Sequence, residues 1–325
     1  MKTRHILLAL IGAAAAAFAA GAQEPSPQTA PRRPGVIGGE SGSGPYPAVA
    51  ELAASLDDHT IYHPRKAPAG RMPIMLWGNG GCRDNGLAYA HFLREIASHG
   101  YVVVAAGHAR YEEPIRPALP FTTAPVPATG APGATSPPQQ ADETQAAQVI
   151  EGLDWALAEN ERRESPFYHR LDPHAVAVMG HSCGGLQAIA VAADPRIRTS
   201  MILSSGVYNR GTASGRSRIA VTKAQLADIH GPVAYVNGGP SDIAYANAAD
   251  DFARIDAVPA LFAWYPVGHG GTFYTAPNGG EYGVVAVKWL DWQLKRDRAA
   301  AAFFTGAQCG LCRRPDWTVI RKHIE

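Results

Sequence analysis

Residues 175–193 have the sequence AVAVMGHSCGGLQAIAVAA. The first five residues form a short apolar run, which is typical of a strand covered on both faces of a sheet. The last nine residues favour a helix, and Gly180-His181-Ser182-Cys183-Gly184 lies between the two. The segment therefore predicts a strand, a sharp turn and a helix, with Ser182 at the apex of the turn.

Ser182 is a candidate nucleophile because of its place in this turn. A sharp strand-to-helix turn holds a serine hydroxyl clear of the sheet, but it crowds the backbone, and glycines two residues before and after the serine remove the clash. The start of the helix supplies N–H groups that favour a developing negative charge. A Gly-x-Ser-x-Gly motif alone often arises by chance, and the alternative is a tight structural turn. The flanking strand and helix favour the nucleophile.

Apolar runs and helical patterns alternate along the rest of the chain. Strands are expected at 60–62, 73–77, 101–106, 175–179, 200–203, 233–236 and 260–265, and helices at 87–98, 140–157, 184–193, 244–255 and 283–297. This alternation predicts an α/β fold with a mostly parallel sheet, helices on both faces and right-handed crossovers.

The arrangement around Ser182 resembles the α/β-hydrolase superfamily, and the order of elements from about residue 60 to 297 agrees with it. The resemblance implies an α/β-hydrolase fold without a large cap domain, and a serine esterase activity. The pattern is similar to dienelactone-hydrolase-like, chlorophyllase-like and polyester-hydrolase enzymes. It departs from the polyester hydrolases at Cys183, where they usually carry Met, and from dienelactone hydrolases in having Ser as nucleophile. The ester substrate, small or polymeric, therefore stays open.

The resemblance implies that the acid of a catalytic triad follows a later strand. After 233–236 comes the turn-rich sequence Asn-Gly-Gly-Pro-Ser-Asp, which ends at Asp242. We expect Asp242 to orient the histidine and to stabilise its charged form. Asp250 and Asp251 are rivals, but they lie in the next helical pattern and are expected to be solvated. The alternative role for Asp242 is to cap a turn or helix.

The base is expected on the loop after the last predicted strand, 260–265. His269 lies there between glycines, in Pro-Val-Gly-His-Gly-Gly. The chain has 12 histidines, so position decides the assignment. His108 is the leading rival and is expected at the edge of a pocket, whereas His181 is expected to be structural. The resulting order is Ser182, Asp242, His269.

The resemblance also implies two backbone N–H groups that stabilise an oxyanion. One belongs to Cys183, the residue after the nucleophile, and the other comes from the loop Gly-Asn-Gly-Gly-Cys at 78–82. By position we favour Gly81, while Asn79, Gly80 and Cys82 stay possible. A glycine-rich dinucleotide turn is disfavoured because Arg83 stands where the third glycine belongs.

The chain has four cysteines, Cys82, Cys183, Cys309 and Cys312, and the expected position of the two N–H groups suggests how they pair. Two N–H groups that bind one oxygen lie within about 4–5 Å of each other. The Cα atoms of Cys82 and Cys183 then fall in the range for a disulfide. We expect this bond and a second one between Cys309 and Cys312. The alternatives for the second pair are half a zinc site or a redox Cys-x-x-Cys motif.

The N-terminal segment 1–22 predicts a secretory signal peptide. A short basic lead precedes an apolar, alanine-rich run, and Ala-Gly-Ala at 20–22 is a typical cleavage signature, so cleavage is expected near Ala22. A membrane anchor is the alternative, but about 15 apolar residues fall short of the ~20 that span a bilayer. The expected location is therefore secreted or periplasmic.

The rest of the chain is expected to form one catalytic domain at 46–325. Residues 23–45, rich in Pro, Gly and Ser, predict a flexible leader. Within the domain, the Pro-rich segment 111–139 predicts a long loop insertion, either a flap over the site or a surface excursion. Residues 299–325, with the Cys-x-x-Cys sequence, are expected as a C-terminal tail.

The charge balance gives no sign of a charged partner. The chain has 29 Lys and Arg against 28 Asp and Glu, a net charge of +1. Neither nucleic-acid binding nor stable membrane insertion is expected, and no metal or organic cofactor is implied. The oligomeric state stays open. Trp77, Tyr208 and Phe273 could line an acyl pocket or belong to the core. An acyltransferase with the same triad and a non-catalytic binding protein on this fold remain alternatives.

Overall fold

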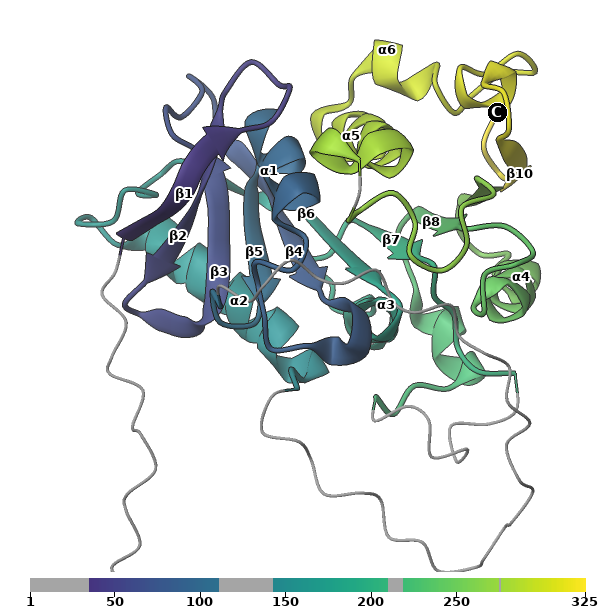
Figure 1. The fold of residues 1–325 in the computed structure, drawn as a ribbon, viewed down its shortest axis with the longest axis horizontal. Helices are drawn as coiled ribbons and strands as arrows, with labels where there is room; N and C mark the ends of the chain where they lie inside the picture. The colour runs from purple at the N-terminus through teal and green to yellow at the C-terminus, as the bar shows by residue number, and fades with distance from the viewer. Residues whose placement is uncertain (1–34, 111–142, 210–218, 275) are drawn as a thin grey trace, which may run out of the picture. The chain divides into compact units, whose positions relative to one another are not determined.

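The computed structural model describes residues 35–110, 143–209, 219–274 and 276–325, all within the unit 33–325 (Figure 1). The predicted signal peptide at 1–22 and the Pro-rich insertion at 111–139 lie outside the described residues. None of the helices in the described ranges has the length and apolar character required to cross a bilayer.

Ten strands form one sheet, in the order β1-β2-β3-β5-β4-β6-β7-β8-β9-β10. The bounds are β1 Gly35–Ser41, β2 Ala48–Ala53, β3 Leu56–Pro64, β4 Met72–Gly78, β5 Val102–Ala106, β6 Leu171–His181, β7 Thr199–Leu203, β8 Val233–Asn237, β9 Ala260–Trp264 and β10 Thr318–Lys322. The six strands from β5 to β9 in this order pair in parallel, and the outer strands pair antiparallel. The predicted α/β class with a mostly parallel sheet is confirmed.

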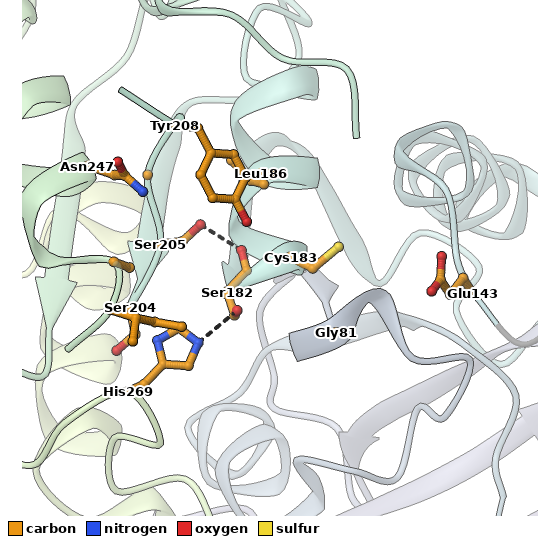
Figure 2. Close-up of a pocket in the computed structure, with 13 residues that line it drawn as sticks. Gly81, Glu143, Ser182, Cys183, Leu186, Ser204, Ser205, Tyr208, Asn247 and His269 are labelled. Carbon is orange, nitrogen blue, oxygen red and sulfur yellow. Dashed lines mark hydrogen bonds between the residues drawn. The ribbon is translucent and has the colours of Figure 1, made fainter. Parts of the chain in front are cut away.

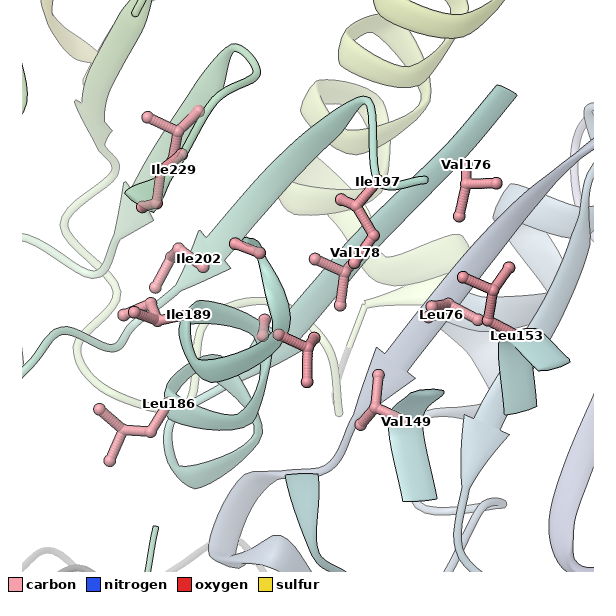
Figure 3. Close-up of a cluster of buried hydrophobic side chains, with 14 of the residues drawn as sticks. Leu76, Val149, Leu153, Val176, Val178, Leu186, Ile189, Ile197, Ile202 and Ile229 are labelled. Carbon is pink, nitrogen blue, oxygen red and sulfur yellow. The ribbon is translucent and has the colours of Figure 1, made fainter. Parts of the chain in front are cut away.

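Helices cover both faces of the sheet (Figure 1). Their bounds are α1 Ala90–Ser98, α2 Ala146–Glu161, α3 Cys183–Val191, α4 Tyr245–Arg254, α5 Gly280–Lys295 and α6 Arg298–Ala301, with 3-10 turns η1 Gly80–Cys82, η3 Lys223–Asp228, η4 Pro277–Gly279 and η5 Leu311–Arg313. Apolar residues of α2, α3 and α4 belong to one buried cluster, and those of α1 and α5 to another. Figure 3 shows the first cluster, with Leu153 of α2 beside Leu76 of β4 and Ile189 of α3 beside Ile202 of β7.

Strand β4 explains why the central strands are apolar without interruption. Ile74 and Leu76 enter the first cluster, whereas Met75 and Trp77 enter the second. Because successive side chains of a strand point to opposite faces, a strand covered on both sides is buried at every position. All seven residues of β4 are buried.

The two edges of the sheet correct the sequence predictions. The flexible leader predicted for 23–45 is wrong for residues 35–45, because β1 pairs antiparallel with β2 and buries Ile37. The domain therefore includes residues before its predicted start at 46. The segment 299–325 is not a mere tail, since β10 pairs with β9 along its whole length. In both strands the backbone pairing supplies the order that composition did not suggest.

The carboxyl ends of the parallel strands lie at one edge of the sheet. The segments that follow β4, β6, β8 and β9 begin there and carry the oxyanion candidates, Ser182, Asp242 and His269 respectively. Such an edge is the usual ligand-binding region of an open α/β sheet.

Candidate active site

Ser182 lies at the apex of a strained turn between β6 and α3. Its φ of 53° and ψ of −116° are unusual for a residue with a side chain. A Cβ atom on Gly184 would lie 2.0 Å from the carbonyl oxygen of Gly78, so only glycine fits at 184. The Ser182 N–H donates to the Leu203 carbonyl at 3.0 Å, and the Ser205 hydroxyl donates to the Ser182 carbonyl at 2.6 Å. The turn is therefore held from β7 as well.

Ser182, His269 and Asp242 form a continuous hydrogen-bonded chain. Oγ of Ser182 lies 2.9 Å from Nε2 of His269, and Nδ1 of His269 lies 2.7 Å from Oδ1 of Asp242. Figure 2 shows the first of these contacts. An ionised carboxylate only accepts hydrogen bonds, so Nδ1 carries the proton of a neutral imidazole. Nε2 then accepts from the Ser182 hydroxyl, which is the arrangement that a general base requires.

Asp242 has a buried side chain whose two oxygens both accept hydrogen bonds. Oδ2 accepts from the Gly238 N–H at 3.0 Å, and Oδ1 accepts from the Ala244 N–H at 2.9 Å as well as from His269. Burial alone would raise the pKa of Asp242, but its hydrogen bonds with His269 and with the backbone outweigh burial, and the pKa is lower than usual. The carboxylate is therefore ionised at neutral pH.

Two backbone hydrogen bonds hold the loops of the acid and the base together. The Gly268 N–H donates to the Gly238 carbonyl at 2.8 Å, and the Tyr265 N–H donates to the Asn237 carbonyl at 3.0 Å. These bonds join the loop after β8 to the loop after β9. Asp242 and His269, 27 residues apart in sequence, thereby come into contact.

The rival residues have other partners. Asp250 and Asp251 lie in α4, as expected, but Asp251 is buried and not solvated. It accepts from the Val207 N–H at 2.8 Å, the Tyr235 hydroxyl at 3.1 Å and Lys223 at 2.5 Å, which make up for the lost water. His108 pairs with Asp84 at 2.7 Å and does not line the pocket described below.

A pocket of about 250 Å³ opens at the Ser182 hydroxyl. Its lining residues are Gly81, Glu143, Ser182, Cys183, Leu186, Ser204, Ser205, Gly206, Tyr208, Ile243, Ala244, Asn247 and His269. Figure 2 shows Ser204, Ser205 and Asn247 on the His269 side and Glu143 beyond Gly81. Tyr208 lines the pocket, which is one of the two roles that the sequence left open for it. Trp77 and Phe273 do not, because both are fully buried in the core with α1 and α5.

The two predicted oxyanion donors lie beside Ser182 at this pocket. Within the turn, the Gly80 N–H donates to the Tyr89 hydroxyl at 3.1 Å, and the Cys82 N–H donates to the Asn79 carbonyl at 3.0 Å. No hydrogen bond among the described residues uses the N–H of Gly81 or of Cys183. Of the alternatives at 79–82, Gly81 is the residue that lines the pocket, which favours it as the second donor.

Both predicted disulfides are confirmed. Cys82 and Cys183 are bonded with their Cα atoms 5.2 Å apart, and Cys309 and Cys312 are bonded with theirs 5.0 Å apart. The first bond joins the glycine-rich turn to the residue after Ser182. The second occupies both sulfurs of the Cys-x-x-Cys sequence, which leaves no thiolate for a zinc ion. In the described ranges no group of three or more His, Cys, Asp or Glu side chains could hold a metal.

Sequence reasoning did not identify Ser205 or Tyr89. Ser205 follows β7 at the same sheet edge as the other site residues, so a polar residue directly after an apolar strand was a usable signal. Tyr89 carried no such signal, since its contact with His181 at 2.6 Å joins residues 92 positions apart. His181, expected to be structural, is buried at the centre of these contacts.

No protein-family model matches the chain, and a search of curated proteins found no match.

Proposed function

We propose that this protein is a serine hydrolase of the α/β-hydrolase fold, and that it cleaves carboxylic esters through an acyl-enzyme. The observation that carries the proposal is the Ser182–His269–Asp242 chain, with contacts of 2.9 and 2.7 Å, at the apex of a strand–turn–helix. Gly81 and Cys183, the two expected oxyanion donors, line the same pocket as Ser182 and add to the support. A hydroxyl with a base on one side and hydrogen-bond donors on the other suits acyl transfer.

In the acylation step His269 Nε2 removes the proton of Ser182 as Oγ attacks the ester carbonyl carbon. The carbonyl oxygen becomes an oxyanion, which accepts hydrogen bonds from the N–H groups of Gly81 and Cys183. Asp242 stabilises the positive charge that forms on the imidazole. His269 then gives its proton to the leaving alcohol, and the acyl group stays on Ser182.

In the deacylation step water takes the place of the alcohol. His269 Nε2 removes a proton from the water as its oxygen attacks the acyl carbon. The second tetrahedral oxyanion uses the same two N–H donors. Its collapse returns the proton to Ser182 and releases the carboxylic acid.

The two disulfides bear on the proposed location. Disulfides persist in oxidising compartments such as the periplasm and the extracellular space. Both pairs of cysteines are bonded. The two disulfides are consistent with the export that the N-terminal segment predicts. We therefore include a secreted or periplasmic location in the proposal.

The test is turnover of p-nitrophenyl acetate by Ser182→Ala. Removal of the nucleophile should lower kcat by about 10⁴–10⁶-fold. Ser200→Ala is the matched control, because Ser200 is a buried serine in β7 outside the pocket lining, and it should retain wild-type kcat. Turnover by Ser182→Ala at the wild-type rate would refute the proposal.

Covalent labelling gives an independent test. A fluorophosphonate should react with the wild-type protein, and peptide mass spectrometry should find the adduct on Ser182. An adduct on another residue would contradict the proposed nucleophile. Product analysis with an added alcohol separates hydrolysis from acyl transfer, since hydrolysis predicts the free acid as the main product.

A further inference from the structure

A second chain of hydrogen bonds runs beside the candidate site, through four side chains that do not line the pocket. Arg83 Nη2 lies 3.2 Å from the Tyr274 hydroxyl, which contacts the Tyr89 hydroxyl. The Tyr89 hydroxyl lies 2.6 Å from Nδ1 of His181, and Nε2 of His181 lies 2.8 Å from the backbone carbonyl oxygen of His269. We name these five groups the tyrosine–histidine chain.

The two ends of the tyrosine–histidine chain fix the direction of every bond in it. The guanidinium of Arg83 can only donate, and the carbonyl of His269 can only accept. His181 therefore donates from Nε2, and in a neutral imidazole its Nδ1 accepts the proton of the Tyr89 hydroxyl. The Tyr89 oxygen in turn accepts from Tyr274, whose oxygen accepts from Arg83. Each donor has one acceptor, so the network is fully satisfied.

The glycine-rich turn is attached at the centre of this chain. The Gly80 N–H donates to the Tyr89 hydroxyl at 3.1 Å. A Cβ atom on Gly80 would lie 2.3 Å from the Tyr89 oxygen and 2.5 Å from Nδ1 of His181, so the backbone of Gly80 is in direct contact with both side chains. Gly81, the proposed oxyanion donor, is the next residue.

The centre of the tyrosine–histidine chain is buried and packed against an aromatic ring. Tyr89 is 1% exposed and His181 is 4% exposed. The ring of Phe273 packs against both, with centroid distances of 5.4 Å to Tyr89 and 5.1 Å to His181. Burial and, secondarily, the neighbouring His269 lower the pKa of His181 to about 3, so its imidazole is neutral at physiological pH. A neutral ring supplies the one donor and one acceptor that the chain requires.

We propose that Tyr89 and His181 are positioning residues, which hold the oxyanion turn and the backbone of His269 at a fixed separation. The inference rests on the proposed function. Neither side chain lines the pocket, so neither is expected to contact the substrate. Together they link the two loops whose groups must act together, the N–H of Gly81 on one side and the imidazole of His269 on the other.

The physical basis is the distance dependence of oxyanion stabilisation. A donor acts best at about 2.7–3.1 Å from the place where the oxyanion forms. A displacement of about 1 Å can lower the rate by ~10²-fold. Loss of the Tyr89 hydroxyl leaves the Gly80 N–H and Nδ1 of His181 without partners, so the two loops lose the connection that runs through this oxygen.

The test is Tyr89→Phe, which removes one oxygen atom and keeps the ring. We expect kcat for p-nitrophenyl acetate to fall by about 10–100-fold while KM changes little. The affinity for a boronic acid, which forms a tetrahedral anion on serine, should fall by a similar factor. Tyr101→Phe is the matched control. It removes a buried tyrosine hydroxyl that donates to Asp291 at 2.7 Å, outside the chain and the pocket, and it should keep wild-type kcat and boronate affinity.

The results for the Ser182 and Tyr89 variants distinguish a failure of the positioning role from a failure of the proposed function. Wild-type turnover that does not depend on Ser182 refutes the function. Turnover that depends on Ser182, together with unchanged kcat and boronate affinity in folded Tyr89→Phe, refutes the positioning role alone. A loss that appears only in KM refutes it too.

A second measurement decides the matter if Tyr89→Phe does not fold. Nitrogen-15 NMR of labelled histidine in the wild-type protein should place the proton of His181 on Nε2. A proton on Nδ1 would reverse the bond to Tyr89 and overturn the inference.

Discussion

The two halves of the candidate site are held by different kinds of force. Ser182, Cys183 and Gly81 lie in two turns that a disulfide joins and that backbone contacts at Gly184 crowd together. Asp242 and His269 lie on loops that no disulfide joins, and hydrogen bonds connect these loops to each other and to the rest. We call these the cross-linked half and the hydrogen-bonded half.

The difference agrees with what each half is proposed to do. Oxyanion donors stabilise a charge best when they do not move during the reaction. The disulfide gives the cross-linked half a constraint that the other half lacks. The base must instead exchange protons with serine, alcohol and water in turn, and its position depends on the hydrogen bonds of its ring and its carbonyl. Substitutions in the two halves should therefore fail in different ways.

The largest expected effect is that of Asp242→Asn in the hydrogen-bonded half. The amide can donate to Nδ1 of His269 and favour the wrong tautomer, so kcat should fall by about 10⁴-fold with little loss of stability. Asp250→Asn is the control, because Asp250 pairs with Arg254 and Lys223 on the surface of α4, and it should keep its activity. Turnover numbers for a p-nitrophenyl ester decide the point. A loss below about tenfold would remove Asp242 from the proposed mechanism.

The next prediction compares how much each disulfide contributes to the free energy of unfolding. The Cys82–Cys183 bond closes 101 residues, whereas the Cys309–Cys312 bond closes only 3. By loop entropy, Cys82→Ala with Cys183→Ala should lower the free energy of unfolding by about 4–5 kcal/mol, and Cys309→Ala with Cys312→Ala by about 2 kcal/mol. Urea denaturation measures both.

Activity sharpens the comparison of the disulfides. The first double variant keeps the backbone N–H of residue 183 but loses the bond that fixes its distance from residue 81. We expect its kcat to fall by about tenfold in the fraction that stays folded, and the second variant to keep wild-type kcat. Equal activities in the two variants would show that the cross-link serves stability alone.

The sequence predicted the centre of this fold better than its edges. Central strands such as β4 and β5 are apolar throughout because both faces are covered, and this composition is visible in the sequence. The edge strand β1 has the sequence GVIGGES, and its three glycines resemble a flexible segment. Its order comes from pairing with β2, a long-range contact that composition does not record.

The candidate site could be predicted where local sequence encodes it. Ser182, Asp242 and His269 each follow an apolar run and lie among glycines or other turn residues, so their place at the sheet edge could be inferred. Trp77 and Phe273 show the limit of this reasoning, because the strand and loop that carry them turn both rings into the core. The contact between Tyr89 and His181 is likewise a property of the packed structure and of no local motif.

The smallest expected effect is the contribution of His181, which links the two halves, to the pH dependence of the free energy of unfolding. A histidine whose pKa is lower in the folded state than in the unfolded state stabilises the fold above the unfolded value, near 6.5, and loses that contribution as the pH falls toward the folded value of about 3. Between pH 6.5 and pH 5 the loss should approach about 2 kcal/mol.

His181→Gln isolates this contribution, because glutamine does not titrate and its amide can still donate to the His269 carbonyl. The difference in the free energy of unfolding between the two proteins, measured by urea denaturation at each pH, should change steadily across this range. The contributions of other groups cancel in that difference. Parallel curves for wild type and variant would mean that the pKa of His181 is the same in the folded and unfolded states. His181 would then be protonated in the folded protein below about pH 6.5, where it has no acceptor for the Tyr89 hydroxyl, and the hydrogen-bonded half would lose its link to the glycine-rich turn in that range.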